Sequence, residues 1–210
     1  MPSPWTWDDA SNRYRNTDTG RYIGIRQMLP LRDTFVEAQK SAIDDLAGRL
    51  VTGDIDTAQW VDEFKGILRT TYKDEYALAC GGRNAMTQRD YGIIGRQLRD
   101  QYTYLYRFAD QVENGQLTEG QIRMRSRMYV DSATQAFERG HAAAIGAPDL
   151  PAYPADGSTQ CRSNCKCHWE LRDEGDHWEA FWKLGMAEHC PDCVERSQTW
   201  APLVLEKANA

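Results

Sequence analysis

A cluster of cysteines near the end of the chain constrains the fold more than any other feature. Five of the six cysteines lie between positions 161 and 193, in the pattern C-x3-C-x-C-x22-C-x2-C. They are Cys161, Cys165, Cys167, Cys190 and Cys193. A segment of about 45 residues holds too little apolar core to fold without a cross-link such as a bound metal ion. We therefore expect these thiols to meet at a metal ion, whose binding would stabilise the segment.

The spacing of the cysteines is close to that of a zinc ribbon, with one residue extra in the first pair. Cys190 and Cys193 lie on a tight C-P-D-C turn and form the firmest ligand pair. Cys161 and Cys165 would complete an all-thiolate site, whereas Cys165 and Cys167 share one face of a strand and are a rival pair. We predict a structural zinc ion bound by four of the five cysteines, and which four stays open. A cluster of free thiols or disulfides is the alternative.

Hydrophobic and polar residues alternate on both sides of the turn sequence RDEGD, at positions 167–171 and 178–184. A period of two residues indicates strands, so this stretch predicts a β-hairpin. A short helix is the alternative, because Trp178, Phe181 and Trp182 also fit helical spacing. The hairpin is favoured, and its antiparallel strands would bring the two groups of cysteines together.

Apolar residues recur at helical spacing between positions 30 and 146. Gly53, Gly81 and Gly115 end three segments of this region, and Thr87 and Thr118 cap the segments that follow. These signals predict four helices joined by short turns, which favours antiparallel packing. The predicted fold class is mainly α: an antiparallel helical domain with an extended N-terminal arm and a small C-terminal zinc-ribbon-like β-hairpin module.

The segments outside the helical region are expected to be extended. Residues 1–29 show no helical period and are interpreted as an extended arm, either a partly disordered lead-in or a docking peptide. Arginine and aromatic residues are common interface anchors. The candidates for partner binding are Trp5, Trp7, Tyr14, Arg15, Arg21 and Tyr22. Residues 147–158 hold three prolines and are expected to be a linker. The cysteine-rich module covers residues 159–210, whose tail is expected to order on a partner.

Composition limits where the protein acts. No apolar run approaches the roughly 18–20 residues that span a bilayer, and the first residues lack the apolar stretch of a secretory signal. We therefore expect a protein made and kept in a cytoplasm, with no membrane partner. Thiols stay reduced in that compartment, so clustered cysteines bind metal more often than they form disulfides. Cys80, in the helical region, is expected to be a small buried hydrophobic residue.

Two other classes of function fit parts of the sequence. His168 and Glu170, followed by C-P-D-C, resemble the H-x-E…P-C-x-x-C signature of zinc deaminases. The proline here lies between the cysteines, however, and H-x-E falls on an expected strand. No other nucleophile, base and oxyanion donor assemble in the sequence, so we expect no enzyme. A zinc-ribbon nucleic-acid-binding module is the nearer alternative, although the net charge of -6 argues against it.

Several stretches of the sequence are similar to a known family. They are RYRNTDTGRY, RDYGIIGRQLRDQYTYLYRFADQV, GSTQCRSNCKCHW and AEHCPDCVERSQTWAPL. Together they resemble phage structural proteins of the head-morphogenesis, or minor head protein, kind. The most specific parts are Asn-Cys-basic-Cys at positions 164–167 and the Cys-x-x-Cys that precedes Trp200-Ala-Pro. Members of the family often carry these two motifs in the opposite order.

The resemblance implies a role in the phage virion. It implies a minor head or capsid-associated component that acts in head assembly or at the portal, in several copies per particle. The expected partners are the portal, the major capsid protein or a connector, with nucleic acid as a secondary partner. The expected location is the virion head, assembled in the host cytoplasm, and no catalysis is implied.

Overall fold

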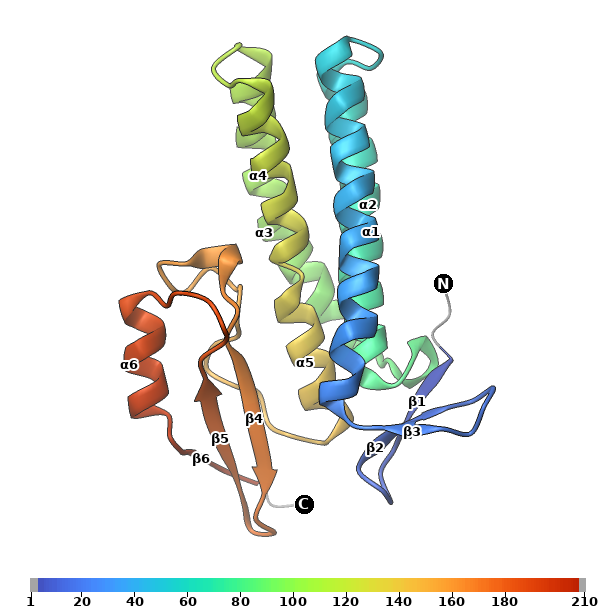
Figure 1. The fold of residues 1–210 in the computed structure, drawn as a ribbon, viewed down its shortest axis with the longest axis vertical. Helices are drawn as coiled ribbons and strands as arrows, with labels where there is room; N and C mark the ends of the chain where they lie inside the picture. The colour runs from blue at the N-terminus through green and yellow to red at the C-terminus, as the bar shows by residue number, and fades with distance from the viewer. Residues whose placement is uncertain (1–3, 208–210) are drawn as a thin grey trace.

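The structure is a computed structural model that describes residues 4–207, and helices dominate it (Figure 1). An elongated helical domain is formed by α1 (Ile25–Thr52), α2 (Thr57–Cys80), α3 (Gln88–Glu113), α4 (Glu119–Asp131) and α5 (Thr134–Ala144). Two small three-stranded sheets flank one end of this domain. The predicted mainly-α class is therefore confirmed. Within residues 4–207, no helix is both long and apolar enough to cross a bilayer.

Local capping chemistry sets most of the helix boundaries. The side chains of Asp56, Thr87 and Thr118 each accept a hydrogen bond from the backbone N–H three residues further on. The side chain at that third position in turn accepts a hydrogen bond from the backbone N–H of the cap residue. Each pair of bonds satisfies two amide groups that the helix leaves unpaired. Gly53 ends α1 in the left-handed conformation, with φ of 78°, which glycine adopts without a steric cost.

Two helix boundaries differ from those predicted. Helix α1 begins at Ile25, five residues before position 30, because the side chain of Gln27 bonds back to the N–H of Gly24 and starts the helix there. The fourth predicted helix is divided at Ser132 into α4 and α5. The hydroxyl of Ser132 donates to the carbonyl oxygen of Tyr129 at 2.7 Å, and such local bonds compete with the helical ladder.

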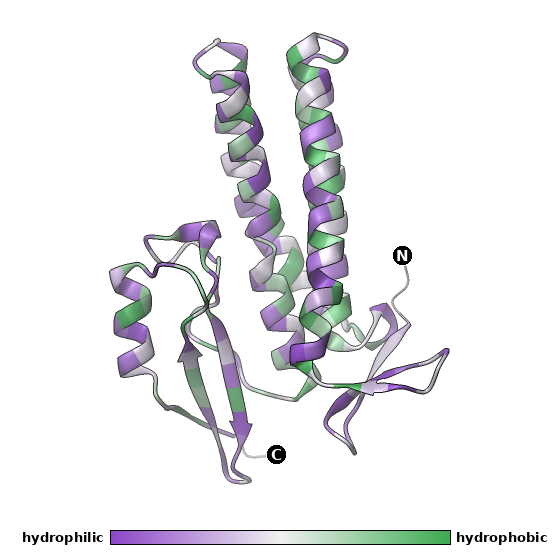
Figure 2. Ribbon diagram, viewed as in Figure 1, coloured by the Kyte–Doolittle hydropathy of each residue, from purple (hydrophilic) through white to green (hydrophobic). Residues whose placement is uncertain are grey.

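Helix α2 lies at the centre of the domain and packs against α1, α3 and α5. Its Trp60 and Phe64 meet Phe108 of α3 and Tyr129 of α4, with ring centroids 5.1–5.3 Å apart in edge-to-face geometry. Hydrophobic and hydrophilic residues intersperse along each long helix (Figure 2), as expected for helices with one face in a core. The α1–α2 and α3–α4 turns lie side by side at the end remote from both sheets (Figure 1).

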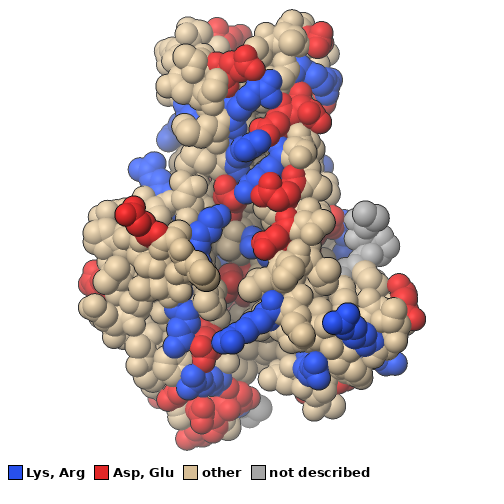
Figure 3. Space-filling model, viewed as in Figure 1, with Lys and Arg blue, Asp and Glu red and all other residues tan. Residues whose placement is uncertain are grey.

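Charged side chains of both signs line the seam between α1 and α4 (Figure 3). Nε of Arg127 lies 2.8 Å from a carboxylate oxygen of Asp44, and Nζ of Lys40 lies 3.0 Å from Asp131. Nη1 of Arg123 donates to the backbone oxygen of Asp44 at 2.9 Å. The arginines of α4 at this seam are therefore matched by acceptors on α1, and they fix how the two helices align.

Residues 4–29 form a folded sheet and the start of α1 instead of a free arm. The strands are β1 (Trp5–Asp8), β2 (Arg13–Asn16) and β3 (Tyr22–Ile23), paired antiparallel. Tyr14 is fully buried against the helices. Its hydroxyl donates to the carbonyl oxygen of Ala79 at 2.6 Å and lies 3.0 Å from Nδ1 of His141. These contacts attach the sheet to α2 and α5, and burial lowers the pKa of His141 to about 4.

An ion pair is buried where α1, α2 and α5 meet. Nε of Arg32 donates to Oε2 of Glu75 at 2.6 Å, and Nη2 donates to the hydroxyl of Thr134 at 2.7 Å. Glu75 is fully buried. Burial raises the pKa of its carboxyl to about 7, although Arg32 acts in the opposite direction. The folded chain therefore binds a proton at Glu75 more tightly than the unfolded chain does.

The first prediction concerns Gly140, where α5 approaches α2 closely. A Cβ at Gly140 would overlap the carbonyl oxygen of Tyr76 and lie 3.1 Å from Cβ of Ala79. We predict that Gly140→Ala lowers the free energy of unfolding by about 1–3 kcal/mol, measured by urea denaturation. Gly66→Ala on α2 is the control, because a Cβ there meets nothing within 4 Å, and it should stabilise the helix by up to about 1 kcal/mol. Unchanged stability of Gly140→Ala would contradict the close α2–α5 contact.

The second prediction concerns pH. The pKa of Glu75 is about 7 in the folded state, above the value of about 4.3 expected in an unfolded chain. Its contribution to stability is therefore fully present below the unfolded pKa and is lost as pH rises through 7. We expect Glu75→Gln to flatten the fall in stability between pH values of about 4.5 and 7.5, followed by urea denaturation. The exposed Glu113→Gln is the matched control, and an unchanged slope in Glu75→Gln would contradict the assignment.

Candidate metal centre

The C-terminal region forms the second small sheet together with a short helix. Its elements are β4 (His168–Asp173), β5 (His177–Lys183), α6 (Pro191–Thr199) and β6 (Leu203–Glu206). Strand β4 pairs antiparallel with β5, with Trp169 opposite Trp182, so the predicted hairpin is confirmed. Strand β6 pairs with the other edge of β5. The tail that was expected to order on a partner is therefore part of this sheet over residues 203–206, and residues 208–210 lie outside the described part.

The expected linker, residues 147–158, is packed into the module. Leu150 and Tyr153 are buried in one apolar cluster with Trp169. Nε1 of Trp169 also donates to the carbonyl oxygen of Ala152 at 2.9 Å. The prolines shape a segment that covers one side of the cysteine module, because apolar residues between them face its core.

The cysteine thiols converge between the first loop of the module and the start of α6. Sγ of Cys193 lies 3.7 Å from Sγ of Cys161 and 3.7 Å from Sγ of Cys165. Sγ of Cys190 lies 3.6 Å from Sγ of Cys161. The sulfurs of Cys161, Cys165 and Cys193 all lie within 4.8 Å of one another. Cys165 and Cys193 are buried, whereas Cys161 and Cys190 are half-buried. This cluster can hold a metal ion.

The separations between the sulfurs fit a tetrahedral shell. Four sulfurs at about 2.3 Å from a central zinc ion lie about 3.8 Å from one another, by the geometry of a tetrahedron. The separations of 3.6 and 3.7 Å are close to that edge length. The sulfurs of Cys161, Cys165 and Cys193 are therefore spaced as ligands of one ion, and Cys190 lies beside them, next to Cys161.

Hydrogen bonds hold the two cysteine segments together. The backbone N–H of Gln160 donates to Oδ2 of Asp192 at 2.8 Å, and Nη1 of Arg196 donates to the hydroxyl of Ser158 at 3.1 Å. Cys190 is the N-cap residue of α6. The amide groups at a helix N-terminus favour negative charge, so this position suits a thiolate.

Cys167 is the fifth thiol and lies at the edge of the cluster. It is buried and shares hydrogen bonds with Cys165 and Cys193. The hydrogen bond with Cys167 lowers the pKa of Cys165 to about 5, although burial acts in the opposite direction. The N–H of Gly185 also bonds to the Cys167 thiol. Of the rival cysteines that the sequence left open, Cys165 belongs to the group of three converging thiols, and Cys167 lies beside it.

Three tryptophans form the packed side of the module. Trp169, Trp182 and Trp200 lie with ring centroids 5.2–5.9 Å apart. The guanidinium of Arg196 lies 5.1 Å from the ring centroid of Trp200. These rings pack β5 against the end of α6, where the N–H of Trp182 also donates to the carbonyl oxygen of Trp200 at 3.1 Å.

The module is attached to the helical domain through residues close to the cysteines. The N–H of Trp169 donates to Oε2 of Glu138 on α5 at 3.3 Å, and burial raises the pKa of that carboxyl to about 7. Nζ of Lys166, between two of the cysteines, lies 3.7 Å from Asp131 of α4. The guanidinium of Arg139 lies 3.8 Å from the ring centroid of Tyr153. The thiol cluster is therefore positioned relative to α4 and α5.

Other candidate residues lie away from the thiols. Cys80 is buried at the end of α2, as predicted. His168, considered for a deaminase site, is exposed at the start of β4 and lies outside the converging thiol group found in residues 4–207. Glu170, the acidic residue of the H-x-E sequence, forms an ion pair with Arg172 at 2.6 Å. The H-x-E residues therefore lie at the surface of strand β4, outside the thiol cluster.

The six residues predicted to bind partners differ in their exposure. Tyr14 is fully buried and contacts the helical domain, so it is not available to a partner. Its burial follows from strand alternation, because Tyr14 and its neighbour Ile23 face inward. The exposed members are Arg15, Arg21 and Tyr22, and Trp5 and Trp7 are half-buried.

The sequence did not predict the α6 helix or the bond between Gln160 and Asp192. A signal for α6 was present, because proline is favoured at the first position of a helix and an acidic residue in its first turn. Pro191 and Asp192 occupy these positions. The C-P-D-C sequence therefore brings two thiols to the start of a helix.

The chain matches no protein-family model, and comparisons with curated proteins and with solved structures found no significant match. The interpretation of the thiol cluster therefore depends on its own geometry.

The third prediction tests the metal cluster directly. Titration of the reduced protein with Co²⁺ should produce a thiolate-to-metal charge-transfer band, and Cys193→Ser should abolish it because Cys193 is a buried member of the converging group. In that variant, proteolysis should cleave within residues 159–207 while α1–α5 stay resistant, because the module loses its staple. Cys80→Ser is the control and should keep the band. An unchanged spectrum and unchanged protease resistance in Cys193→Ser would contradict a shared site.

Proposed function

We propose that the thiol cluster is a structural zinc site with Cys161, Cys165, Cys190 and Cys193 as ligands. The spacing of the sulfurs supports this set, since soft thiolates in a tetrahedron are typical of zinc. Four protein ligands form a closed shell that leaves no position for water or substrate. Zinc bound there would supply folding free energy to a small module. Lys166 and Trp169 would then hold the folded module against α4 and α5.

We further propose that the protein is a phage virion structural protein, a minor head component acting in head assembly or at the portal. The observation that carries this proposal is that the two motifs of the family resemblance meet at one place. The Asn-Cys-basic-Cys motif at 164–167 and the Cys-x-x-Cys at 190–193 both contribute thiols to the cluster. A closed site needs only the meeting of its ligands in space, so the reversed order of the motifs is compatible with the same role.

The N-terminal sheet is the surface that we assign to a virion partner. Arg15 and Tyr22 are cross-strand neighbours on its exposed face, opposite the side that buries Tyr14. Arg21 is exposed next to them. Arginine and tyrosine are enriched among the residues that dominate binding at interfaces. A portal, major capsid or connector protein with an acidic surface would complement this face.

The fourth prediction tests assembly. The chain is produced together with the portal and major capsid proteins of the same virus, and the particles are purified by density gradient and quantified by mass spectrometry. The wild-type chain should sediment with the heads. The double variant Arg15→Glu, Tyr22→Ala should lower its incorporation about tenfold, because each residue is expected to anchor the contact. Arg69→Glu, an exposed change on α2, is the control. Absence of the wild-type chain from heads would refute the proposed role.

A further inference from the structure

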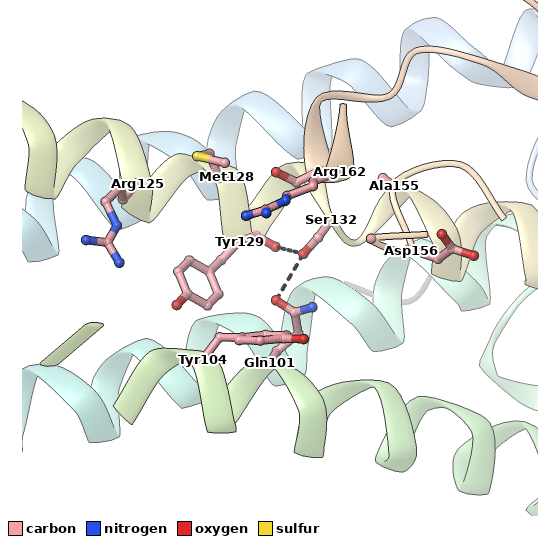
Figure 4. Close-up of a pocket in the computed structure, with 11 residues that line it drawn as sticks. Gln101, Tyr104, Arg125, Met128, Tyr129, Ser132, Ala155, Asp156 and Arg162 are labelled. Atoms are coloured by element: carbon pink, nitrogen blue, oxygen red, sulfur yellow. Dashed lines mark hydrogen bonds between the residues drawn. The ribbon is translucent and has the colours of Figure 1, made fainter. Parts of the chain in front are cut away.

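A cleft of about 500 Å³ lies between α3, α4 and the first cysteine loop (Figure 4). Helix α3 contributes Gln101 and Tyr104, and helix α4 contributes Arg125 and Tyr129. Residues 155–157 and 162–163 of the cysteine module close the third side. The cleft is separate from the thiol cluster, but both use the same C-x3-C loop. Its volume falls within the range of about 300–1,000 Å³ that is usual for small-molecule sites.

Two guanidinium groups face this cleft without a carboxylate partner. Nη1 of Arg125 donates to the amide oxygen of Gln111 at 2.5 Å, and its guanidinium lies 4.3 Å from the ring centroid of Phe108. Arg162 reaches into the cleft from the loop and lies near Tyr129 in Figure 4. Within residues 4–207, the neighbouring Arg123, Arg127 and Lys166 form ion pairs with carboxylates, whereas Arg125 and Arg162 form none. The two positive charges therefore remain available to an anion.

The extra residue of the C-x3-C sequence explains the position of Arg162. The three residues between Cys161 and Cys165 form a 3-10 turn, in which the N–H of Asn164 bonds to the carbonyl oxygen of Cys161 at 2.9 Å. Arg162 begins this turn with φ of 48°, a left-handed conformation that is uncommon outside glycine and asparagine. This turn directs Arg162 away from the thiols and toward α4. The longer spacing therefore has a structural result beyond metal binding.

The other walls of the cleft offer aromatic rings and uncharged hydrogen-bonding groups. Tyr104 lines the cleft and is 56% exposed, so its side chain is accessible to a ligand. The ring of Tyr129 packs edge-to-face with that of Phe64. The hydroxyl of Ser132 lies 3.3 Å from Oε1 of Gln101. These groups suit a planar ring with polar edges.

One carboxylate, that of Asp156, also lines the cleft. It accepts hydrogen bonds from the backbone N–H groups of Tyr153 at 2.7 Å and Ser158 at 2.8 Å. In Figure 4 it points away from Arg125 and Arg162. The negative charge is therefore used by the loop and leaves the arginine side of the cleft positive.

We propose that this cleft binds a nucleoside monophosphate, with the phosphate on Arg125 and Arg162 and the base against Tyr104. Guanidinium groups form strong, charge-assisted hydrogen bonds with phosphate oxygens. Any of the nucleobases can stack on an exposed tyrosine ring, because each has a flat π-face. An inorganic phosphate would use only the arginines, and a nucleoside only the ring and the amide. Both parts of the cleft are engaged only by a ligand that carries the two groups together.

The test is isothermal titration of the full chain with AMP and dCMP, at low salt. We expect binding by the wild-type chain and a loss of affinity of about tenfold or more in both Arg125→Gln and Arg162→Asn. Asparagine is chosen at position 162 because it tolerates positive φ. Arg69→Gln on α2 is the control and should bind as the wild type does. Tyr104→Ala should also weaken binding, since it removes the stacking ring.

Three outcomes would overturn the proposal. They are no binding of either nucleotide at millimolar concentration, equal affinity for inorganic phosphate and for the nucleotides, and full affinity in both arginine variants. Arg125 lies on α4 and does not adjoin the cysteines, so loss of binding in Arg125→Gln, with an unchanged unfolding midpoint in urea, reports on the cleft and not on the thiol cluster. This result is independent of the proposed zinc site and of the proposed role in the virion.

Discussion

The close approach of α5 to α2 is the contact on which both small sheets depend. Gly140 lets the two helix backbones come together at Tyr76, where any side chain would intervene. The N-terminal sheet is fixed to the same pair of helices through the hydroxyl of Tyr14, which bonds to Ala79. The cysteine module is fixed to the other side of α5 through Glu138. One helix–helix contact thus sets the position of two elements that lie far apart in the sequence.

The cysteine module combines three means of stabilisation, each weak alone. Its strands are short, its apolar core is centred on three tryptophans, and its thiols come from two separate segments. The bond between Gln160 and Asp192 joins these segments through the backbone. Small sheets need such additional restraints, because the free energy gained by burying their apolar area scarcely exceeds the entropy cost of ordering the chain.

Local chemistry could be read from the sequence, and long-range contacts could not. The cap at Thr118 and the pairing of Trp169 with Trp182 follow from nearby residues, so the helices and the hairpin were predicted. The convergence of the cysteines was predicted from spacing, since a hairpin returns the chain to its start. The choice between Cys165 and Cys167 required coordinates, because alternation places both on the same face, and only Cys165 belongs to the group of three.

The interpretation of the N-terminal residues failed for a related reason. Tyr14 bonds to groups 65 and 127 residues away, and no pattern within residues 1–29 indicates that those groups will be there. Strands of four, four and two residues also give too short an alternation to identify a sheet. The packing of residues 147–158 was missed similarly, because prolines suggested a linker and the aromatic partner of the segment follows only at Trp169.

The two loops that join helices at the remote end of the domain have a consequence for how this protein can change during evolution. The α1–α2 and α3–α4 turns contact neither sheet nor the thiols (Figure 1). Paired insertions of whole helical turns at these two tips would lengthen the domain while leaving its base unaltered, since α-helices extend without changing what lies behind them. The length of the helical domain is thus a variable that selection can adjust separately from the base that carries the thiol cluster, and related chains are expected to differ most in size at these tips.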